Sequence, residues 1–254
     1  GAPGADVMSG GAGDDRYVLD DPQDVAVEAE GAGNDTAIVS ISTLLGPNLE
    51  NLALVGGDAI DGSGNALANV LVGNAASNRL FGLAGNDLIA GGRGDDLLDG
   101  GAGDDLYLYH QGEGRDPIVD ASGTDTLRFG AGITLDAVAA RPITVDGQKR
   151  IFLALLGPDG STRDDQGVEV AAAYGVERFE FADGSVRSLA ELLIGTRSLN
   201  GSNVADTLIG DRRDDKIVAG NGNDTVFGRW GNDTLDGGNG ADKLFGEGGD
   251  DTLD

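Results

Sequence analysis

Residues 222–254 read GNDTVFGRWGNDTLDGGNGADKLFGEGGDDTLD, where glycine, aspartate and a single aliphatic residue recur at a fixed interval. The interval is nine residues, and six such units follow one another without a gap from residue 201. Every unit has aspartate at its sixth position: Asp206, Asp215, Asp224, Asp233, Asp242 and Asp251. The eighth position is always aliphatic. Such a glycine-rich period disfavours a helix and predicts a repeat architecture.

The same nine-residue frame occurs in the first half of the chain. Its sixth position holds, in chain order, Asp6, Asp15, Asn69, Asn78, Asp87, Asp96 and Asp105. Further aspartates follow these units at steps of nine or eleven residues: Asp24, Asp35, Asp116 and Asp125. Steps of eleven indicate two-residue insertions, and we expect the repeat structure to reach residue 129.

Each position of the unit has a physical role. Glycines allow a tight turn with positive φ, and the last three residues form a minimal strand with one inward side chain. Two units on opposite sides of a narrow core make one coil of eighteen residues, so aspartates eighteen residues apart become neighbours. Sites made only of carboxylate and carbonyl oxygens suit Ca²⁺, and we expect several such ions.

The pattern G-G-x-G-x-D-x-U-x resembles the nonapeptide of the RTX (repeats-in-toxin) family, a calcium-binding parallel β-helix repeat. The resemblance implies an all-β, right-handed parallel β-roll, that is, a β-helix solenoid. In such a roll one turn gives the carbonyls of its second and fourth residues with its sixth-position carboxylate. The turn two units later gives its first and third carbonyls with its own carboxylate.

Carried onto this chain, the resemblance pairs sixth positions eighteen residues apart. The pairs are Asp206 with Asp224, Asp215 with Asp233, Asp224 with Asp242, Asp233 with Asp251, Asp87 with Asp105, and Asn78 with Asp96. The candidate metal-binding residues given by the repeat frame and by this resemblance are Asp6, Gly11, Gly13, Asp15, Asp24, Asp35, Asn78, Leu83, Gly85, Asp87, Gly91, Gly92, Arg93, Gly94, Asp96, Gly100, Gly101, Ala102, Gly103, Asp105, Asp116, Asp125, Ser202, Val204, Asp206, Asp211, Arg213, Asp215, Ala219, Gly220, Asn221, Gly222, Asp224, Gly228, Arg229, Trp230, Gly231, Asp233, Gly237, Asn239, Asp242, Gly246, Gly248 and Asp251.

Some units depart from the pattern, and we expect weaker cation binding there. Ser202, Val204, Asp211 and Arg213 replace glycine at the start of the last block, and asparagine removes a charge at residues 69 and 78. Asp242 and Asp251 lack a neighbour two units further on in this sequence, so we expect their outer sites to be incomplete.

The pattern divides the chain into four segments. Residues 1–58 are predicted to form an N-terminal roll with irregular repeats and longer strands, and residues 59–129 the first regular roll. Residues 130–198 lack the repeat and read as a β-rich insert, with an Asp146-Gly147 hairpin turn and one short helix after Ser188. Residues 199–254 form the second regular roll.

Composition excludes several functional classes. The chain has 44 Asp and Glu against 17 Lys and Arg, a net charge of −27, so nucleic acid and anionic membranes are unfavourable partners. Cysteine is absent, which excludes disulfides and thiolate metal sites. No apolar run is long enough to span a bilayer, and the sequence shows no signal peptide.

The preferred functional hypothesis is a non-catalytic calcium-binding segment of a larger secreted bacterial protein. The resemblance implies export, unfolded, through a type I secretion apparatus, and folding outside the cell on binding calcium. Two alternatives stay open: part of an RTX enzyme (a protease, a lipase or a polysaccharide-modifying protein), or a stalk segment of an RTX adhesin. Many equivalent carboxylate pairs favour metal binding over catalysis, which needs one differentiated site. We expect the single histidine, His110, and the single tryptophan, Trp230, to be exposed.

Overall fold

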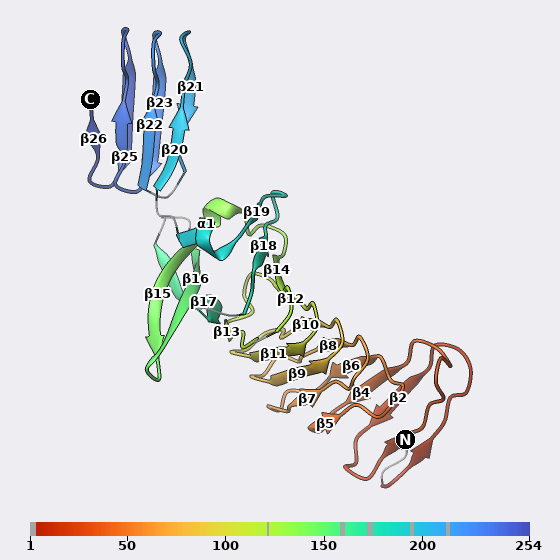
Figure 1. Cartoon of the computed structure of the whole chain (residues 1–254). Helices are drawn as coiled ribbons and strands as arrows, with labels where there is room; N and C mark the ends of the chain where they lie inside the picture. The colour runs from red at the N-terminus through yellow and green to blue at the C-terminus, as the bar shows by residue number, and fades with distance from the viewer. Residues whose placement is uncertain (1–3, 121, 158–160, 172–174, 194–195, 212–213) are drawn as a thin grey trace. The chain divides into compact units, whose positions relative to one another are not determined.

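A computed structural model describes residues 4–120, 122–157, 161–171, 175–193, 196–211 and 214–254 (Figure 1). The chain divides into two compact units, one of residues 1–155 and 163–189 and the other of residues 156–162 and 190–254. Within the described residues the only helices are the 3₁₀ helix η1 (Leu135–Ala137) and the α-helix α1 (Leu189–Leu193). Neither is long and apolar enough to cross a lipid bilayer. The predicted all-β parallel solenoid is therefore confirmed.

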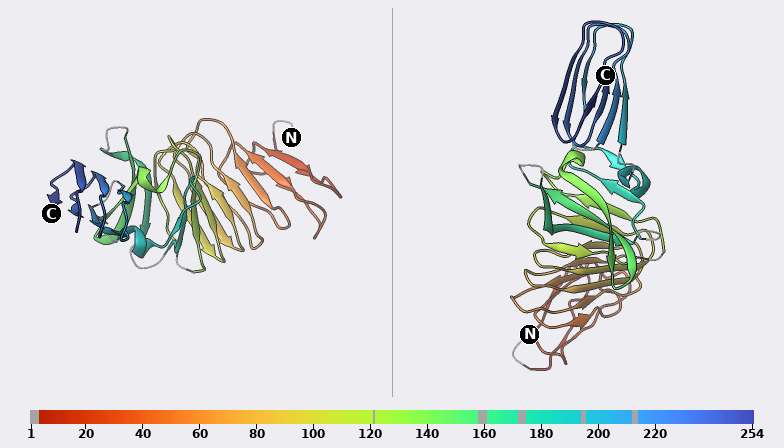
Figure 2. Two further views of the ribbon diagram at one scale, coloured as in Figure 1. Left: turned by 90° about the horizontal axis from the view of Figure 1, so that it is seen from above. Right: turned by 90° about the vertical axis from the view of Figure 1, so that its left-hand side faces the viewer.

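The first unit is a solenoid built around a nine-stranded sheet, whose stacked strands are visible in Figure 2. In spatial order its strands are β2 (Arg16–Leu19), β4 (Thr36–Val39), β6 (Asn51–Leu54), β8 (Val70–Val72), β10 (Leu88–Ala90), β12 (Leu106–Tyr109), β14 (Thr126–Phe129), β18 (Arg178–Glu180) and β19 (Val186–Arg187). All the pairings are parallel except that of β18 with β19. This sheet joins segments far apart in the sequence.

A second sheet runs along the opposite side of the coils. Its strands are β5 (Thr43–Leu44), β7 (Gly62–Ser63), β9 (Arg79–Ala84) and β11 (Leu97–Ala102). Nearer the N-terminus, β1 (Val7–Met8) pairs in parallel with β3 (Val25–Ala26).

The register follows the predicted coil of eighteen residues where the repeats are regular. Leu71 pairs with Ile89, and Ile89 with Tyr107, which stack one inward side chain per coil. All three are fully buried, while their neighbours in each strand are more exposed, as period-two alternation requires. Elsewhere the coil length varies: Thr36 pairs with Asn51 and Leu106 with Thr126, spacings of 15 and 20 residues.

The non-repeat segment adds the strands β15 (Val138–Val145), β16 (Gln148–Leu156) and β17 (Thr162–Ala171). They join β13 (Arg115–Pro117) of the preceding roll in a small sheet of order β13-β17-β16-β15. The hairpin of β15 and β16 turns at Asp146 (φ 49°) and Gly147 (φ 77°), the two positive angles that a type I′ turn requires. Later in the same segment, β18 returns to the solenoid and pairs with β14. The insertion therefore lengthens one coil without ending the large sheet.

The second unit contains a roll of two facing sheets. One holds β20 (Thr196–Asn200), β22 (Asp214–Val218), β24 (Thr234–Asp236) and β26 (Thr252–Leu253), and the other β21 (Thr207–Ile209), β23 (Thr225–Trp230) and β25 (Lys243–Gly248). Every pairing is parallel with an offset of eighteen residues, for example Leu208 with Val226 and Val226 with Leu244. The core is only one side chain deep on each side, with Ile217, Val226 and Leu235 fully buried. Little apolar area is therefore available to stabilise this roll.

Candidate metal centre

A row of acidic and amide side chains, here called the ladder, lies at the N-terminal ends of the strands in the nine-stranded sheet. Its members share one place, directly before a strand, and are Asp15, Asp35, Glu50, Asn69, Asp87, Asp105, Asp125 and Glu177. Along most of the ladder, the backbone N–H of one member donates to the side-chain oxygen of the next, at 2.7–2.9 Å. The sheet register thus stacks the side chains one coil apart.

The other turns carry equivalent ladders. In the first unit the backbone N–H of Asp6 donates to Asp24, that of Asn78 to Asp96 and that of Asp96 to Asp116, at 2.7–2.9 Å. In the second unit two ladders join the remaining predicted pairs: Asp206 with Asp224, Asp224 with Asp242, Asp215 with Asp233, and Asp233 with Asp251. The structure thus brings together all the pairs that the repeat period predicts.

Each hydrogen bond uses only one oxygen of a carboxylate. In the part of the chain that the structure describes, the Oδ2 atoms of Asp35, Asp87, Asp96, Asp105, Asp224 and Asp233 are buried and accept no hydrogen bond. A buried ionised oxygen without a partner costs several kcal/mol, so such an atom needs a cation or a proton. Their recurrence at one repeat position favours a repeated ligand.

Backbone carbonyls converge on the same oxygens. A Cβ atom on Gly82, the first residue of its unit, would lie 2.2 Å from Asp87 Oδ2 and 2.5 Å from the carbonyl oxygen of Gly100. At Gly228 the corresponding distances are 2.2 Å to Asp233 Oδ2 and 2.9 Å to the carbonyl oxygen of Gly246. First-position glycine therefore leaves open a space bounded by carboxylate and carbonyl oxygens, a donor set that fits Ca²⁺.

Burial disfavours the ionised form of the stacked carboxyls. Desolvation, followed by the charges of neighbouring carboxylates, raises the pKa of Asp87 and Asp105 to about 6, of Asp125 to about 7 and of Asp116 to about 8. The pKa of Asp96 is likewise raised to about 6. In the absence of a cation, these groups therefore take up protons near neutral pH.

These shifts predict how the stability of the calcium-free first unit depends on pH. A carboxyl whose folded pKa is raised binds its proton more tightly when folded, so its contribution is complete below the unfolded pKa of 3.8. The contribution is lost as the pH rises through about 6 to 8. We therefore expect calcium-stripped protein to keep more β-structure at pH 5 than at pH 8.

Saturating calcium should reverse this order, because protons compete with the cation for the same oxygens. Circular dichroism without calcium and urea melts with calcium, each at both pH values, test the two parts. Asp116→Asn is the informative variant, since it removes the carboxyl whose pKa is raised to about 8. Calcium-free protein with more β-structure at pH 8 than at pH 5 would contradict the expected sign.

Where asparagine replaces aspartate, its side-chain N–H groups contact the neighbouring carbonyl oxygens directly. The Nδ2 of Asn78 donates to the carbonyl of Ile60 at 2.7 Å, and that of Asn69 donates to the carbonyls of Leu49 and Glu50 at 3.2 Å. These N–H groups occupy carbonyl oxygens that a cation would otherwise contact. The neutral amide also lacks the negative charge of a carboxylate. The weaker binding expected here stays a prediction, now with a geometric reason.

The irregular units of the second roll differ in another way. Ser202 donates its backbone N–H and its hydroxyl to Asp206 Oδ2, at 2.6 and 2.8 Å, and these bonds lower the pKa of Asp206. Asp211 is buried, and its N–H donates to Asp215 Oδ2. Arg213, another predicted position, lies outside the described residues.

His110 and Trp230 are both exposed, and His110 faces Glu113.

In several units the second position has a left-handed backbone, even where the residue is not glycine. The φ angle is 93° at Gly92 and 95° at Gly101, but the same place holds Leu83 (80°), Arg229 (81°) and Glu247 (70°). A residue with a Cβ costs about 1–2 kcal/mol in this conformation.

We expect Leu83→Gly to stabilise the first unit by about 1 kcal/mol, because it relieves this strain and Leu83 is 47% exposed. The midpoint of urea unfolding in saturating calcium measures the change. Val70→Gly is the matched control, since Val70 is similarly exposed but lies in strand β8 with ordinary φ. It should destabilise the protein, and a destabilised Leu83→Gly variant would show that Leu83 is not strained.

Four acidic residues near the sites were missed from the sequence. Glu50 and Glu177 are ladder members directly before β6 and β18, and Glu28 and Asp120 lie beside the ladder. The sequence could have indicated Glu50 and Glu177 as ladder members, because each directly precedes a stretch in which apolar and polar residues alternate as in a strand. Their spacing from the neighbouring aspartates breaks the nine-residue frame, which hid them.

Comparison with known protein families agrees with this geometry. A model of the RTX calcium-binding nonapeptide repeat matches the chain in four copies, over residues 1–21, 72–107, 200–235 and 227–254. The matched residues contain most of the regular aspartate pairs described above. No curated protein sequence matches the chain.

Proposed function

The chain carries four copies of the RTX calcium-binding nonapeptide repeat, and on that premise we propose that it is a calcium-dependent folding module without catalysis of its own. The observation that supports this most directly is the row of buried carboxylate oxygens without hydrogen-bond partners, such as those of Asp87, Asp96 and Asp105. Calcium bound between coils would neutralise these groups and link successive turns.

Charge and a thin core make the cation energetically important. The net charge of −27 opposes compaction, and the second unit buries few apolar side chains. A site with calcium at a hundredfold excess over its Kd adds about 2.7 kcal/mol, so four sites add about 11 kcal/mol. This sum is comparable to the net stability of a whole domain, about 5–15 kcal/mol.

We further propose that the module is part of a larger bacterial protein exported through a type I secretion apparatus. RTX repeats are typical of secreted bacterial proteins. A chain that folds only with calcium would stay unfolded in the calcium-poor cytosol and fold after export. The absence of cysteine is compatible with this route, since no disulfide has to form outside the cell.

Circular dichroism of the whole chain tests the proposed folding. We expect a β-sheet spectrum and a cooperative thermal transition in excess Ca²⁺, and a largely disordered spectrum after calcium is removed at pH 7.5. Mg²⁺ at the same concentration should restore little structure, because it keeps its water ligands and demands octahedral geometry. Full β-structure in excess chelator would refute calcium-dependent folding.

The absence of catalysis has its own test. Equivalent carboxylate pairs recur along each ladder, whereas an acid and base for catalysis must differ in environment. The calcium-loaded chain should therefore show no protease, lipase or polysaccharide-cleaving activity. An activity that disappears when one carboxylate pair is changed, while calcium-dependent folding survives, would favour the enzyme hypothesis.

A further inference from the structure

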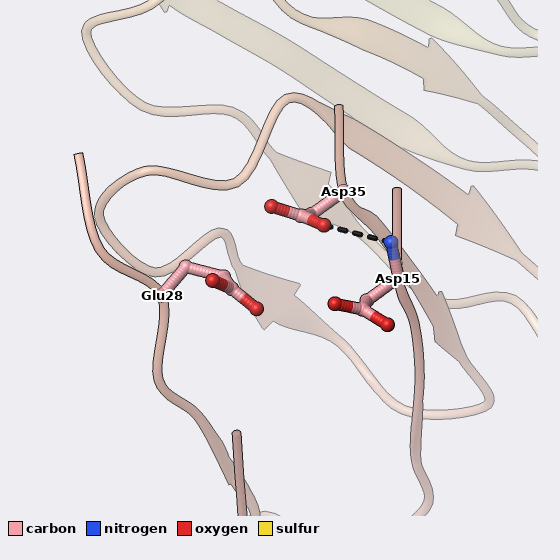
Figure 3. A group of neighbouring side chains, drawn as sticks. All are labelled: Asp15, Glu28 and Asp35. Carbon is pink, nitrogen blue, oxygen red and sulfur yellow. Dashed lines mark hydrogen bonds between the residues drawn. The ribbon is translucent and has the colours of Figure 1, made fainter. Parts of the chain in front are cut away.

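Two turns of the first unit contain a third carboxylate beside the ladder pair. Asp105, Asp120 and Asp125 each place one oxygen within 4.8 Å of the others, and all three side chains are at least 96% buried. Asp15, Glu28 and Asp35 form a similar group nearer the N-terminus, where the three side chains point toward one another (Figure 3). Glu28 and Asp120 lie outside the repeat pattern that predicts the ordinary pairs.

The two groups are built in the same way around a tyrosine. Tyr17 and Tyr107 occupy the eighth position of their units, where other units have an aliphatic residue. The hydroxyl of Tyr107 accepts the N–H of Gly100 and donates to Asp120. The hydroxyl of Tyr17 accepts the N–H of Gly10 and donates to Glu28.

The third carboxylate takes the place of a first-position glycine. Ala102 bridges Ser122 in parallel register, which puts Asp120 one coil beyond Gly100. Met8 pairs with Ala26, which puts Glu28 one coil beyond Gly10. In an ordinary coil this place supplies only a backbone carbonyl, as Gly100 does beside Asp87. In these two coils it also supplies a charged side chain.

A second observation points to a missing ligand in each group. Asp105 Oδ2 and Asp35 Oδ2 are buried and accept no hydrogen bond from an N–H or hydroxyl group of the described residues. A Cβ on Gly100 would lie 2.1 Å from Asp105 Oδ2 and 2.5 Å from the Tyr107 hydroxyl oxygen, so this Oδ2 faces the group. The Tyr107 proton is already donated to Asp120 and is not available to Asp105. The ion pairs of the described residues involve neither group.

We propose that these two groups are three-carboxylate cation sites, which bind Ca²⁺ more tightly than the ordinary two-carboxylate sites and fill first. The inference rests on the proposed calcium-binding function and adds the order in which the calcium sites fill. Three charges and converging oxygens raise the affinity for a hard cation. Tyr17 and Tyr107 are positioning residues, because each holds the third carboxylate through its hydroxyl.

The tyrosines provide a direct readout, because an excited tyrosine transfers energy to a bound Tb³⁺ ion close to its ring. The whole chain with Trp230→Phe, which removes the single tryptophan, is titrated with Tb³⁺ under tyrosine excitation. Emission should rise with the first two equivalents. Asp120→Asn and Glu28→Gln should each remove about half of this early emission, and Asp58→Asn, an exposed control, should leave it unchanged.

Calcium competition with a chromophoric chelator measures affinity on the same proteins. Asp120→Asn and Glu28→Gln should each weaken one of the tightest sites by at least about tenfold. Tyr107→Phe keeps all three carboxylates, so it should retain calcium binding within a few-fold while it loses the early emission of its site. Early emission that is unchanged in an Asp120→Asn, Glu28→Gln double variant would overturn the assignment.

The outcomes separate this inference from the function on which it rests. If the wild-type chain does not compete with the chelator for calcium, the proposed function fails. If it binds calcium and both carboxylate variants give unchanged isotherms, the third carboxylates share protons instead, and only this inference is overturned. Circular dichroism in saturating calcium checks folding, and if Asp120→Asn does not fold, Glu28→Gln decides the question at the other site.

Discussion

Asp105→Ala should lower the stability of the calcium-saturated first unit by about 5 kcal/mol. Asp105 faces two sites at once. Its Oδ1 accepts the N–H of Asp87 at 2.7 Å, and its own N–H donates to Asp125 Oδ1 at 2.9 Å. Alanine removes a ligand from the site on either side, and two sites at a hundredfold excess of calcium contribute about 2.7 kcal/mol each.

Two further variants separate the causes of this loss. Asp105→Asn keeps an oxygen that can accept the Asp87 N–H but removes the charge, so it should retain the hydrogen bond and lose most of the cation binding. Asp104→Ala is the matched control, since Asp104 is the exposed neighbour and its carboxylate accepts the N–H of Thr124 at 2.8 Å. Urea unfolding of each variant is measured in saturating calcium. If Asp105→Ala loses no more stability in calcium than Asp104→Ala, the carboxylate ladder does not bind the stabilising ion.

The regular part of this ladder could be predicted because the period itself encodes contacts. A nine-residue unit that forms half a coil makes neighbours of residues eighteen apart, and the pairs Asp87–Asp105 and Asp215–Asp233 follow without further information. The inward eighth position likewise gives the core of both rolls, for example Ile89 and Val226. A slip of one residue would turn the inward aliphatic side chains to the outside, so the apolar position fixes which residues face the core.

The irregular coils could not be predicted in the same way. Glu50 and Glu177 join the ladder across spacings of 15 and 52 residues, and nothing in a period fixes the length of an insertion. The third carboxylates depend on Tyr17 and Tyr107, whose hydroxyls matter only once the register of the following coil is known. Strain at Leu83 was hidden for a related reason, because φ belongs to a position in the turn and not to the residue type.

Gly103→Ala should destabilise the first unit by about 3 kcal/mol or more, for a reason unrelated to charge. Gly103 is the fourth residue of its unit, with φ 137°, and a Cβ there would lie 1.9 Å from the carbonyl oxygen of Gly85 in the preceding coil. Adjacent coils are held about 4.8 Å apart by their strands, so the carbonyl cannot move away without breaking the sheet register. That carbonyl is also one of the predicted calcium ligands.

Gly13→Ala isolates the contribution of backbone strain. Gly13 occupies the same fourth position with φ 116°, but a Cβ there meets no atom within 4 Å. This control should therefore lose only about 1 kcal/mol, the cost of alanine at positive φ. The difference between the variants in urea midpoint measures the close approach of one coil to the next. Gly103→Ala should also need more calcium to reach half-maximal folding, whereas equal losses at the two positions would show that coil spacing tolerates a side chain and that glycine is required only for its φ angle.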